Sequence, residues 1–169
     1  MPIYSSDICY PEYQEAFFYY LFGVDEMDCY GVIDFVNEKA ILFIPRLDNL
    51  YKIWMTVMDQ EAAKAKYPLL DEVRYCDEME EFFNSHKADT VFVNLGVNSD
   101  SGLTTMIPED KWYRASGART ENTIMHNILS ESRVYKNDEE MEIMRWASKI
   151  TCEAHCNVMR NVKPGMREC

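Results

Sequence analysis

Few side chains in this sequence have the types and spacing that a catalytic or metal centre requires. The closest approach is the stretch Cys152-x-x-His155-Cys156. On a helix these residues share one face, so two thiolates and one imidazole could converge on Zn²⁺. A fourth ligand would have to come from elsewhere, and the sequence has no Cys-x-x-Cys pair to supply it. The spacing therefore favours a solvent-facing or partner-facing side of a long helix over a metal site.

The other candidate catalytic residues stand apart from one another along the chain. His86 follows a polar helix end, where a cation suits the helix dipole, and His126 has no acid at ligand spacing. Both are expected to be structural or solvated. The stretch 99–102 lacks the Gly-x-Ser-x-Gly pattern of a nucleophile elbow, and no Walker loop or dinucleotide fingerprint is present. The residues alone thus predict no catalytic residue and no metal ligand in this chain.

Composition narrows the classes of protein and partner. The 169 residues suffice for one domain, or for one domain and part of another, and 47% are apolar, as in globular proteins. The net charge of -12 repels phosphate backbones and anionic membrane surfaces, so neither a nucleic acid nor a membrane is expected as a partner. No secretory signal or membrane-length apolar run is visible, and the six cysteines are scattered. These features predict a cytoplasmic protein with free thiols.

The stretch from Tyr13 to Trp54 is expected to organise the fold. Its aromatic start, residues 13–23, is predicted to be a strand covered on both faces. Two further apolar runs, 29–34 and 39–44, are separated by a short polar turn and predict a hairpin, so that the three strands form a meander. Pro45 has no N–H to donate, so the ladder should end there or lie on an edge of the sheet.

A helix is predicted over residues 49–58, with Leu50, Ile53, Trp54 and Val57 on one face. Asp77 is expected to cap a helix over 78–86 whose Met79, Phe82 and Phe83 point inward. That helix should link two parallel strands in a right-handed crossover. The remaining expectations are helices over 60–66, 123–131 and from Asn137 to before Pro164, strands over 73–75 and 90–95, and loops over 96–102 and most of 103–118.

Several stretches, taken jointly and in order, resemble the N-terminal domain of prolidases, the Xaa-Pro dipeptidases of the creatinase, aminopeptidase P and prolidase group. They cover nearly the whole chain. These stretches are Tyr19-x-Leu21-Phe22-Gly23-Val24, Cys29-Tyr30-Gly31-Val32-Ile33-Asp34, Leu42-Phe43-Ile44-Pro45-Arg46-Leu47, Gly96-Val97-Asn98-Ser99-Asp100-Ser101-Gly102, Arg133-Val134-Tyr135-Lys136-x-Asp138-x-Glu140, Ser148-Lys149-Ile150 and Glu153-Ala154-His155.

The resemblance implies an α/β fold in two parts. Residues 1–136 would form a creatinase/prolidase-like N-terminal domain, a mixed β-sheet flanked by helices with a truncated start. Residues 137–169 would be the first helix of the pita-bread metallopeptidase domain. That domain binds two metal ions, usually manganese, through two Asp, one His and two Glu. These ligands would lie beyond Cys169, so none is carried onto this chain, which is expected to bind no cofactor and to be inactive alone.

The resemblance gives one residue of this chain a functional role. In prolidases of this type, a Trp in the helix after the Pro-Arg-Leu segment reaches from one subunit of a homodimer into the active site of the other. Trp54 occupies that place here, whereas its spacing alone is also that of a core aromatic residue. Two alternatives to a prolidase stay open: an aminopeptidase P-like or creatinase-like relative, and a stand-alone interaction domain of the pseudoenzyme type.

Overall fold

The computed structural model describes residues 13–98, 100–104, 111–114 and 116–167. It divides into two compact units, Met1–His126 and Asn127–Cys169. The domain boundary expected after residue 136 from the resemblance stays a prediction.

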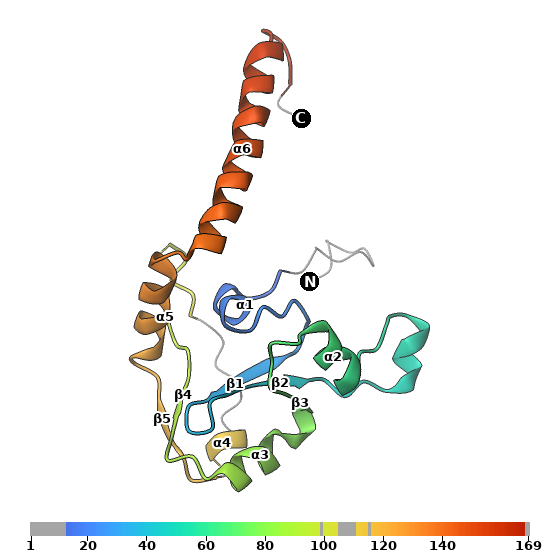
Figure 1. Ribbon diagram of the computed structural model, residues 1–169, viewed down its shortest axis with the longest axis vertical. Helices are drawn as coiled ribbons and strands as arrows, with labels where there is room; N and C mark the ends of the chain where they lie inside the picture. The colour runs from blue at the N-terminus through green and yellow to red at the C-terminus, as the bar shows by residue number, and fades with distance from the viewer. Residues whose placement is uncertain (1–12, 99, 105–110, 115, 168–169) are drawn as a thin grey trace. The chain divides into compact units, whose positions relative to one another are not determined.

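The helices are α1 (Ala16–Phe22), α2 (Gln60–Lys66), α3 (Met79–His86), α4 (Lys111–Arg114), α5 (Met125–Val134) and α6 (Asp138–Asn161) (Figure 1). The strands are β1 (Tyr30–Asp34), β2 (Lys39–Ile44), β3 (Glu72–Tyr75), β4 (Thr90–Phe92) and β5 (Arg119–Glu121). Two 3₁₀ turns, η1 (Asn49–Ile53) and η2 (Cys76–Glu78), complete the described elements.

A three-stranded mixed sheet forms the centre of the first unit, in the order β1-β2-β3. The predicted hairpin is confirmed: β1 and β2 are antiparallel with Tyr30 opposite Phe43, and β2 ends before Pro45. β3 joins the other edge of β2 in parallel. Residues 41–44 are all buried, because β2 lies between the other two strands and both of its faces are covered.

Two apolar clusters cover the opposite faces of this sheet. Ile41 and Phe43 pack with Met79, Phe82 and Phe83 of α3, as predicted for the inward side of that helix. The alternate residues of β2 point the other way, since side chains in a strand alternate between faces. There they pack with Ala63 of α2 and with residues of the adjoining loops, in a cluster of Val24, Leu42, Ile44, Ala63 and Leu70. The expected fold class, a mixed sheet flanked by helices and followed by a long helix, is confirmed.

The prediction of a strand over residues 13–23 is wrong, because this segment contains helix α1. The carboxylate of Glu15 accepts a hydrogen bond from the N–H of Phe18 (2.8 Å) and caps the helix start. Gly23 ends the helix with a φ of 62°, a left-handed conformation that glycine adopts at little cost. The Phe22 ring lies against the backbone of Gly31 in β1, where a Cβ atom would come within 2.2 Å of it. The meander therefore loses its first strand, and local caps outweigh the β propensity of the aromatic run.

The predicted crossover through α3 is also wrong. β4 pairs in parallel with β5 in a separate two-stranded sheet. The parallel crossover of the central sheet runs instead from β2 through α2 to β3. Its register is fixed by Asp71: the N–H of Ala40 donates to the Asp71 carboxylate (2.8 Å), and the N–H of Asp71 donates to the Ala40 carbonyl (2.9 Å).

The interval 103–118 was expected to be mostly loop, and part of it, residues 105–110 and 115, lies outside the described residues. The described part contains the short helix α4, whose Tyr113 is buried and packs edge-on against Phe83. Trp112 packs edge-on against Tyr30 with ring centroids 4.8 Å apart. These aromatic side chains have partners distant in the sequence, so local composition did not reveal their helix.

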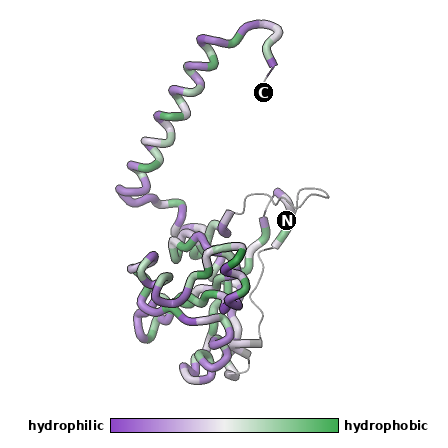
Figure 2. Tube along the Cα trace, turned by 90° about the vertical axis from the view of Figure 1, so that its right-hand side faces the viewer, coloured by the Kyte–Doolittle hydropathy of each residue, from purple (hydrophilic) through white to green (hydrophobic). Residues whose placement is uncertain are grey.

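Helix α6 begins at the predicted cap. The Asn137 side chain accepts from the N–H of Glu140 (2.8 Å), and the Glu140 carboxylate accepts from the N–H of Asn137 (2.9 Å), which is a complete capping box. The helix runs for 24 residues, and none of them is buried. Hydrophilic and hydrophobic residues alternate along it (Figure 2). Among the described helices, none combines the length and the apolar character that crossing a membrane requires.

Candidate functional site

The segment from Leu47 to Met58, termed the arm, connects β2 to α2 and loops out at the right of Figure 1. The helix predicted over residues 49–58 is wrong, because only the 3₁₀ turn η1 forms. Asp48 caps this turn by accepting from the N–H of Leu50 (2.8 Å), and the turn closes where the N–H of Trp54 donates to Tyr51 O (2.9 Å). Most of the predicted apolar face is uncovered: Leu50 and Ile53 are 70% and 72% exposed, and only Val57 is half-buried. A short helix without a packed face is marginal in water, which accounts for the difference.

Trp54 is 86% exposed, so it is not a core aromatic residue of this chain. It lines an open hollow of about 470 Å³ together with the other residues of 52–57. Lys52 is exposed at the same hollow, and no carboxylate of the described residues lies within ion-pair distance of it. The arm thus presents an indole and an ammonium group beside exposed apolar side chains such as Ile53 and Met55. The predicted contribution of Trp54 to the active site of a partner subunit stays a prediction.

Arg46 fixes the start of the arm to the segment that follows β3. Its Nε donates to Asp77 Oδ2 (2.7 Å), and its Nη2 donates to Asp77 Oδ1 (3.2 Å) and Glu78 Oε1 (2.9 Å). The guanidinium carbon also lies 3.7 Å from the centre of the Tyr75 ring. Asp77 was predicted to cap a helix, and this is wrong, because its carboxylate is taken up by Arg46. The hydrogen bond from Arg46 holds the pKa of Asp77 below its usual value.

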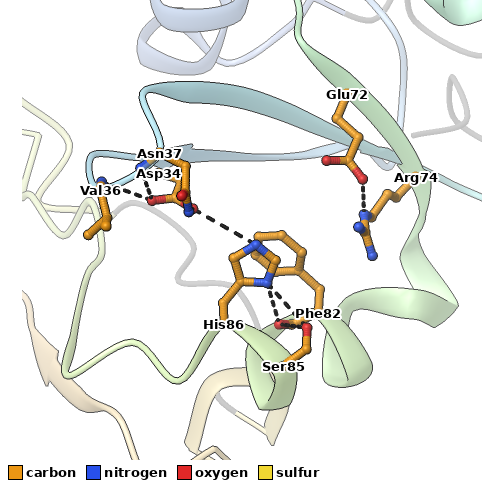
Figure 3. A network of polar contacts seen from close by, with 8 residues as sticks. All are labelled: Asp34, Val36, Asn37, Glu72, Arg74, Phe82, Ser85 and His86. Atoms are coloured by element: carbon orange, nitrogen blue, oxygen red, sulfur yellow. Dashed lines mark hydrogen bonds and ion pairs between the residues drawn. The ribbon is translucent and has the colours of Figure 1, made fainter.

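The turn of the β1–β2 hairpin contacts the end of α3 through Asp34 and His86 (Figure 3). Asp34 accepts from the backbone N–H of Asn37 (3.1 Å) and from its side-chain amide (2.7 Å), and these bonds lower the Asp34 pKa. His86 Nε2 lies 3.9 Å from Asp34 Oδ2, and His86 Nδ1 lies 2.9 Å from the Phe82 carbonyl. This network holds two elements together, so His86 has a structural role.

His126, at the start of α5, occupies a similarly structural position. Its Nδ1 lies 3.1 Å from Asn94 Oδ1, and its ring lies 5.1 Å from that of Phe17. A Cβ atom on Gly96 would come within 2.1 Å of the imidazole, so the ring rests directly on that backbone. The ring is thus enclosed by α1 and by the segment after β4, which suits packing and not metal binding.

The metal-like stretch on α6 does not assemble a metal site within the described part of the chain. Cys152 and His155 are exposed and Cys156 is half-buried, and no three metal-ligating side chains come together among the described residues. The thiols of Cys29, Cys76, Cys152 and Cys156 are free. Burial raises the pKa of Cys29 to about 12 and that of Cys76 to about 11. Since the thiolate is the reactive form, these two half-buried thiols are poor nucleophiles.

The chain matches a known family of proteins. A family model described as aminopeptidase P, N-terminal domain, matches residues 1–92, and the chain belongs to this family. Human Xaa-Pro dipeptidase is 42% identical over 156 residues, which cover 92% of this chain and 31% of the human protein. Mouse Xaa-Pro dipeptidase is 40% identical over 169 residues, which cover 99% of this chain and 34% of the mouse protein. The resemblance to prolidases is confirmed, and the chain spans about a third of the length of these relatives.

Solved structures show the same fold. Proline aminopeptidase P II from Yersinia pestis is 25% identical with a TM-score of 0.72, over 98% of this chain and 40% of that protein. The low-pH form of aminopeptidase P from Escherichia coli is 22% identical with a TM-score of 0.71, over 98% of this chain and 40% of that protein. A fungal relative named "Probable Xaa-Pro aminopeptidase pepP", from Botryotinia fuckeliana, is 28% identical over 98% of this chain and 34% of its own length.

Proposed function

We propose that this chain is the non-catalytic N-terminal portion of a metallopeptidase that hydrolyses Xaa-Pro dipeptides. The observation that carries the proposal is an identity of 40–42% with dipeptidases over 92–99% of the chain. The fungal relative named as an aminopeptidase is 28% identical over a similar stretch. The difference in identity favours a dipeptidase over an aminopeptidase, which remains the alternative. The free thiols suit a cytoplasmic location.

The catalytic metal of this proposal belongs to the part of the relatives that the chain does not span. By family resemblance, two Mn²⁺ ions would be held there by two Asp, one His and two Glu. Metal ions of this kind generate a nucleophilic hydroxide and polarise the scissile carbonyl. One solved relative is a zinc-substituted aminopeptidase P from Escherichia coli in complex with product. The residues of this chain would then assemble the enzyme and shape the site, and perform no step of the chemistry.

The same proposal includes a homodimer in which the arm of one subunit reaches the active site of the other. Two features of the chain support the homodimer. Trp54 is highly exposed, and the other apolar side chains of the arm, such as Leu50 and Ile53, are exposed as well. A further exposed apolar set lies on α6 and includes Ile143, Trp146, Ile150 and Val158. Large apolar surfaces of this kind mark association sites in soluble proteins. A stand-alone interaction domain would share the exposed arm but would have no peptidase attached to it.

The experiment is a chimera in which these 169 residues replace the matching third of mouse Xaa-Pro dipeptidase. We expect the chimera to hydrolyse Gly-Pro with added Mn²⁺, and the 169-residue chain alone to have no turnover. The control is the remaining two thirds of the mouse protein without any N-terminal portion, which should be inactive. A folded, metal-loaded chimera without turnover would contradict the proposal.

A further inference from the structure

The arm is held to the rest of the first unit mainly at its two ends. The hydrogen bonds of residues 48–55 with described partners all stay inside the arm, as between Leu50 and Asp48 or between Trp54 and Tyr51. The large apolar side chains that could have packed the arm against the first unit, such as Leu50, Ile53 and Trp54, are exposed. The direction in which the arm presents Trp54 therefore depends on how its ends are fixed.

The far end of the arm is fixed by packing and by a helix cap. Met58 contacts the apolar cluster that includes Leu42 and Ala63. Asp59 then caps α2 by accepting from the N–H of Ala62 (2.8 Å). Apolar packing and a side-chain cap are common at the junction of a loop and a helix. Here they stabilise the core as well as this end of the arm.

The near end is fixed by Arg46. Among the described residues, it is the one side chain of 45–48 that forms hydrogen bonds with a distant part of the chain. Its planar guanidinium binds both oxygens of Asp77, reaches Glu78 and stacks on Tyr75. A forked contact of this kind sets an orientation, which a single point charge such as that of lysine does not. Since Arg46 directly follows the last β2 contact and Pro45, its orientation sets the path of the chain into the arm.

The energetics separate this role from simple stabilisation. The Arg46 and Asp77 side chains are 51% and 56% exposed, and exposed ion pairs contribute little to folding stability. The guanidinium nevertheless has four defined contacts from one side chain. These contacts thus define the orientation of the side chain closely but add little to the free energy of unfolding. This combination is expected of a group that orients a segment.

We propose that Arg46 is a positioning residue: its clamp on Asp77, Glu78 and Tyr75 sets the direction of the arm and so the place where Trp54 is presented. The effect of this placement on catalysis rests on the proposed function, whereas the clamp itself does not. The substrate site that Trp54 would reach is that of the partner subunit.

The matched control is Arg74, which makes the same kinds of contact away from the arm. Its Nε donates to Glu72 (2.5 Å), and its guanidinium lies 5.2 Å from the centre of the Phe82 ring (Figure 3). Arg46→Met and Arg74→Met each remove one positive charge and one ring contact, together with two ion pairs in the first variant and one in the second. Only the first change touches the arm.

The test is ¹⁹F NMR of the 169-residue chain labelled with 5-fluorotryptophan. The three tryptophans give three signals, and Trp54→Phe assigns the one from the arm. We expect Arg46→Met to shift or broaden the Trp54 signal while the other two stay in place, and Arg74→Met to leave the Trp54 signal unchanged. An unchanged Trp54 signal in Arg46→Met, or an equal change in both variants, would overturn the proposal.

Two further variants keep the test decisive if Arg46→Met fails to fold. Arg46→Lys keeps the charge but not the fork, and Asp77→Asn weakens the clamp from its other side. Both should move the Trp54 signal in the same direction, and circular dichroism checks that each variant is folded. An unmoved Trp54 signal in both folded variants would contradict the positioning role.

Activity assays in the chimera separate this inference from the proposed function. We expect Arg46→Met to lower kcat/KM for Gly-Pro by roughly tenfold, since misplacing a positioning group by about 1 Å can cost on the order of 100-fold. An inactive parent chimera with a Trp54 signal that responds to Arg46 would refute the proposed function and leave the clamp standing. An active chimera with a Trp54 signal that does not respond to Arg46 would support the proposed function and refute the clamp.

Discussion

Strand β2 and the arm that follows it have similar apolar residues and opposite environments. Phe43 and Leu42 are fully buried, whereas Leu50 is 70% exposed a few residues later. The strand is covered because neighbouring strands and two helices meet its faces. The arm has no such neighbours within the described chain. Apolar residues in the first region hold the fold together, and those in the second are available to something outside it.

The largest effect should come from truncating the centre of β2. We expect Phe43→Ala to lower the free energy of unfolding by about 3–5 kcal/mol, because it removes a fully buried ring that packs edge-on against Phe82. Leu50→Ala, in the arm, should change it by less than about 0.5 kcal/mol. Urea unfolding of both variants measures the contrast. Equal losses would mean that the arm is part of the core.

A smaller loss should follow from adding one methyl group where α1 meets β1. We expect Gly31→Ala to cost about 1–3 kcal/mol, because the new Cβ would stand 2.2 Å from the Phe22 ring and force a shift. Gly102→Ala is the control for a new Cβ with open space around it, although its φ of 70° adds backbone strain. A second change, Phe22→Leu, should recover part of the loss at Gly31. Thermal unfolding of the three variants and the double variant checks this packing, and a neutral Gly31→Ala would contradict it.

Local signals accounted for most elements whose ends are marked in the sequence. The helix over 60–66, the hairpin and the capping box at Asn137 all depend on neighbouring residues. The aromatic run before Gly23 was assigned to a strand by propensity, yet the Glu15 cap and the Gly23 stop made it a helix. The predicted pairing of β4 was also wrong, because strand order is decided by contacts between distant segments.

The candidate site was predictable only in part. Trp54 was identified from a resemblance, but spacing could not decide whether its ring was buried. The Arg46 clamp was missed, because Asp77 lies 31 residues further along the chain. The Pro-Arg-Leu motif gave the one available signal, because it places an arginine directly after the end of a strand. No local pattern indicates that its partners are the acids after β3.

Truncating the arm at Trp54 should separate stability from function. We expect Trp54→Ala to change the free energy of unfolding by less than about 0.5 kcal/mol, since the ring is exposed. In the chimera the same variant should impair Gly-Pro hydrolysis, because the partner subunit would lose the indole. Phe35→Ala, which truncates another exposed aromatic in the first unit, is the control and should leave activity unchanged. Unfolding of Trp54→Ala, or full activity of its chimera, would contradict the role given to the arm.

The smallest expected effect is a pH dependence of the arm that has no counterpart in β2. Hydrogen bonding to Arg46 lowers the pKa of Asp77 from its ordinary value of 3.8. A carboxylate whose pKa is lower in the folded state stabilises that state above the ordinary pKa, and the contribution disappears as the pH falls through the lowered value. The clamp should therefore be intact at neutral pH and open only in acid below pH 3.8, without a transition near neutrality.

The fluorine signal of Trp54 in the labelled chain should stay constant from pH 7 downward and then move toward its position in Arg46→Met. Asp77→Asn should abolish most of that movement, because an amide does not titrate. A Trp54 signal that titrates equally in Asp77→Asn would show that another group controls the arm.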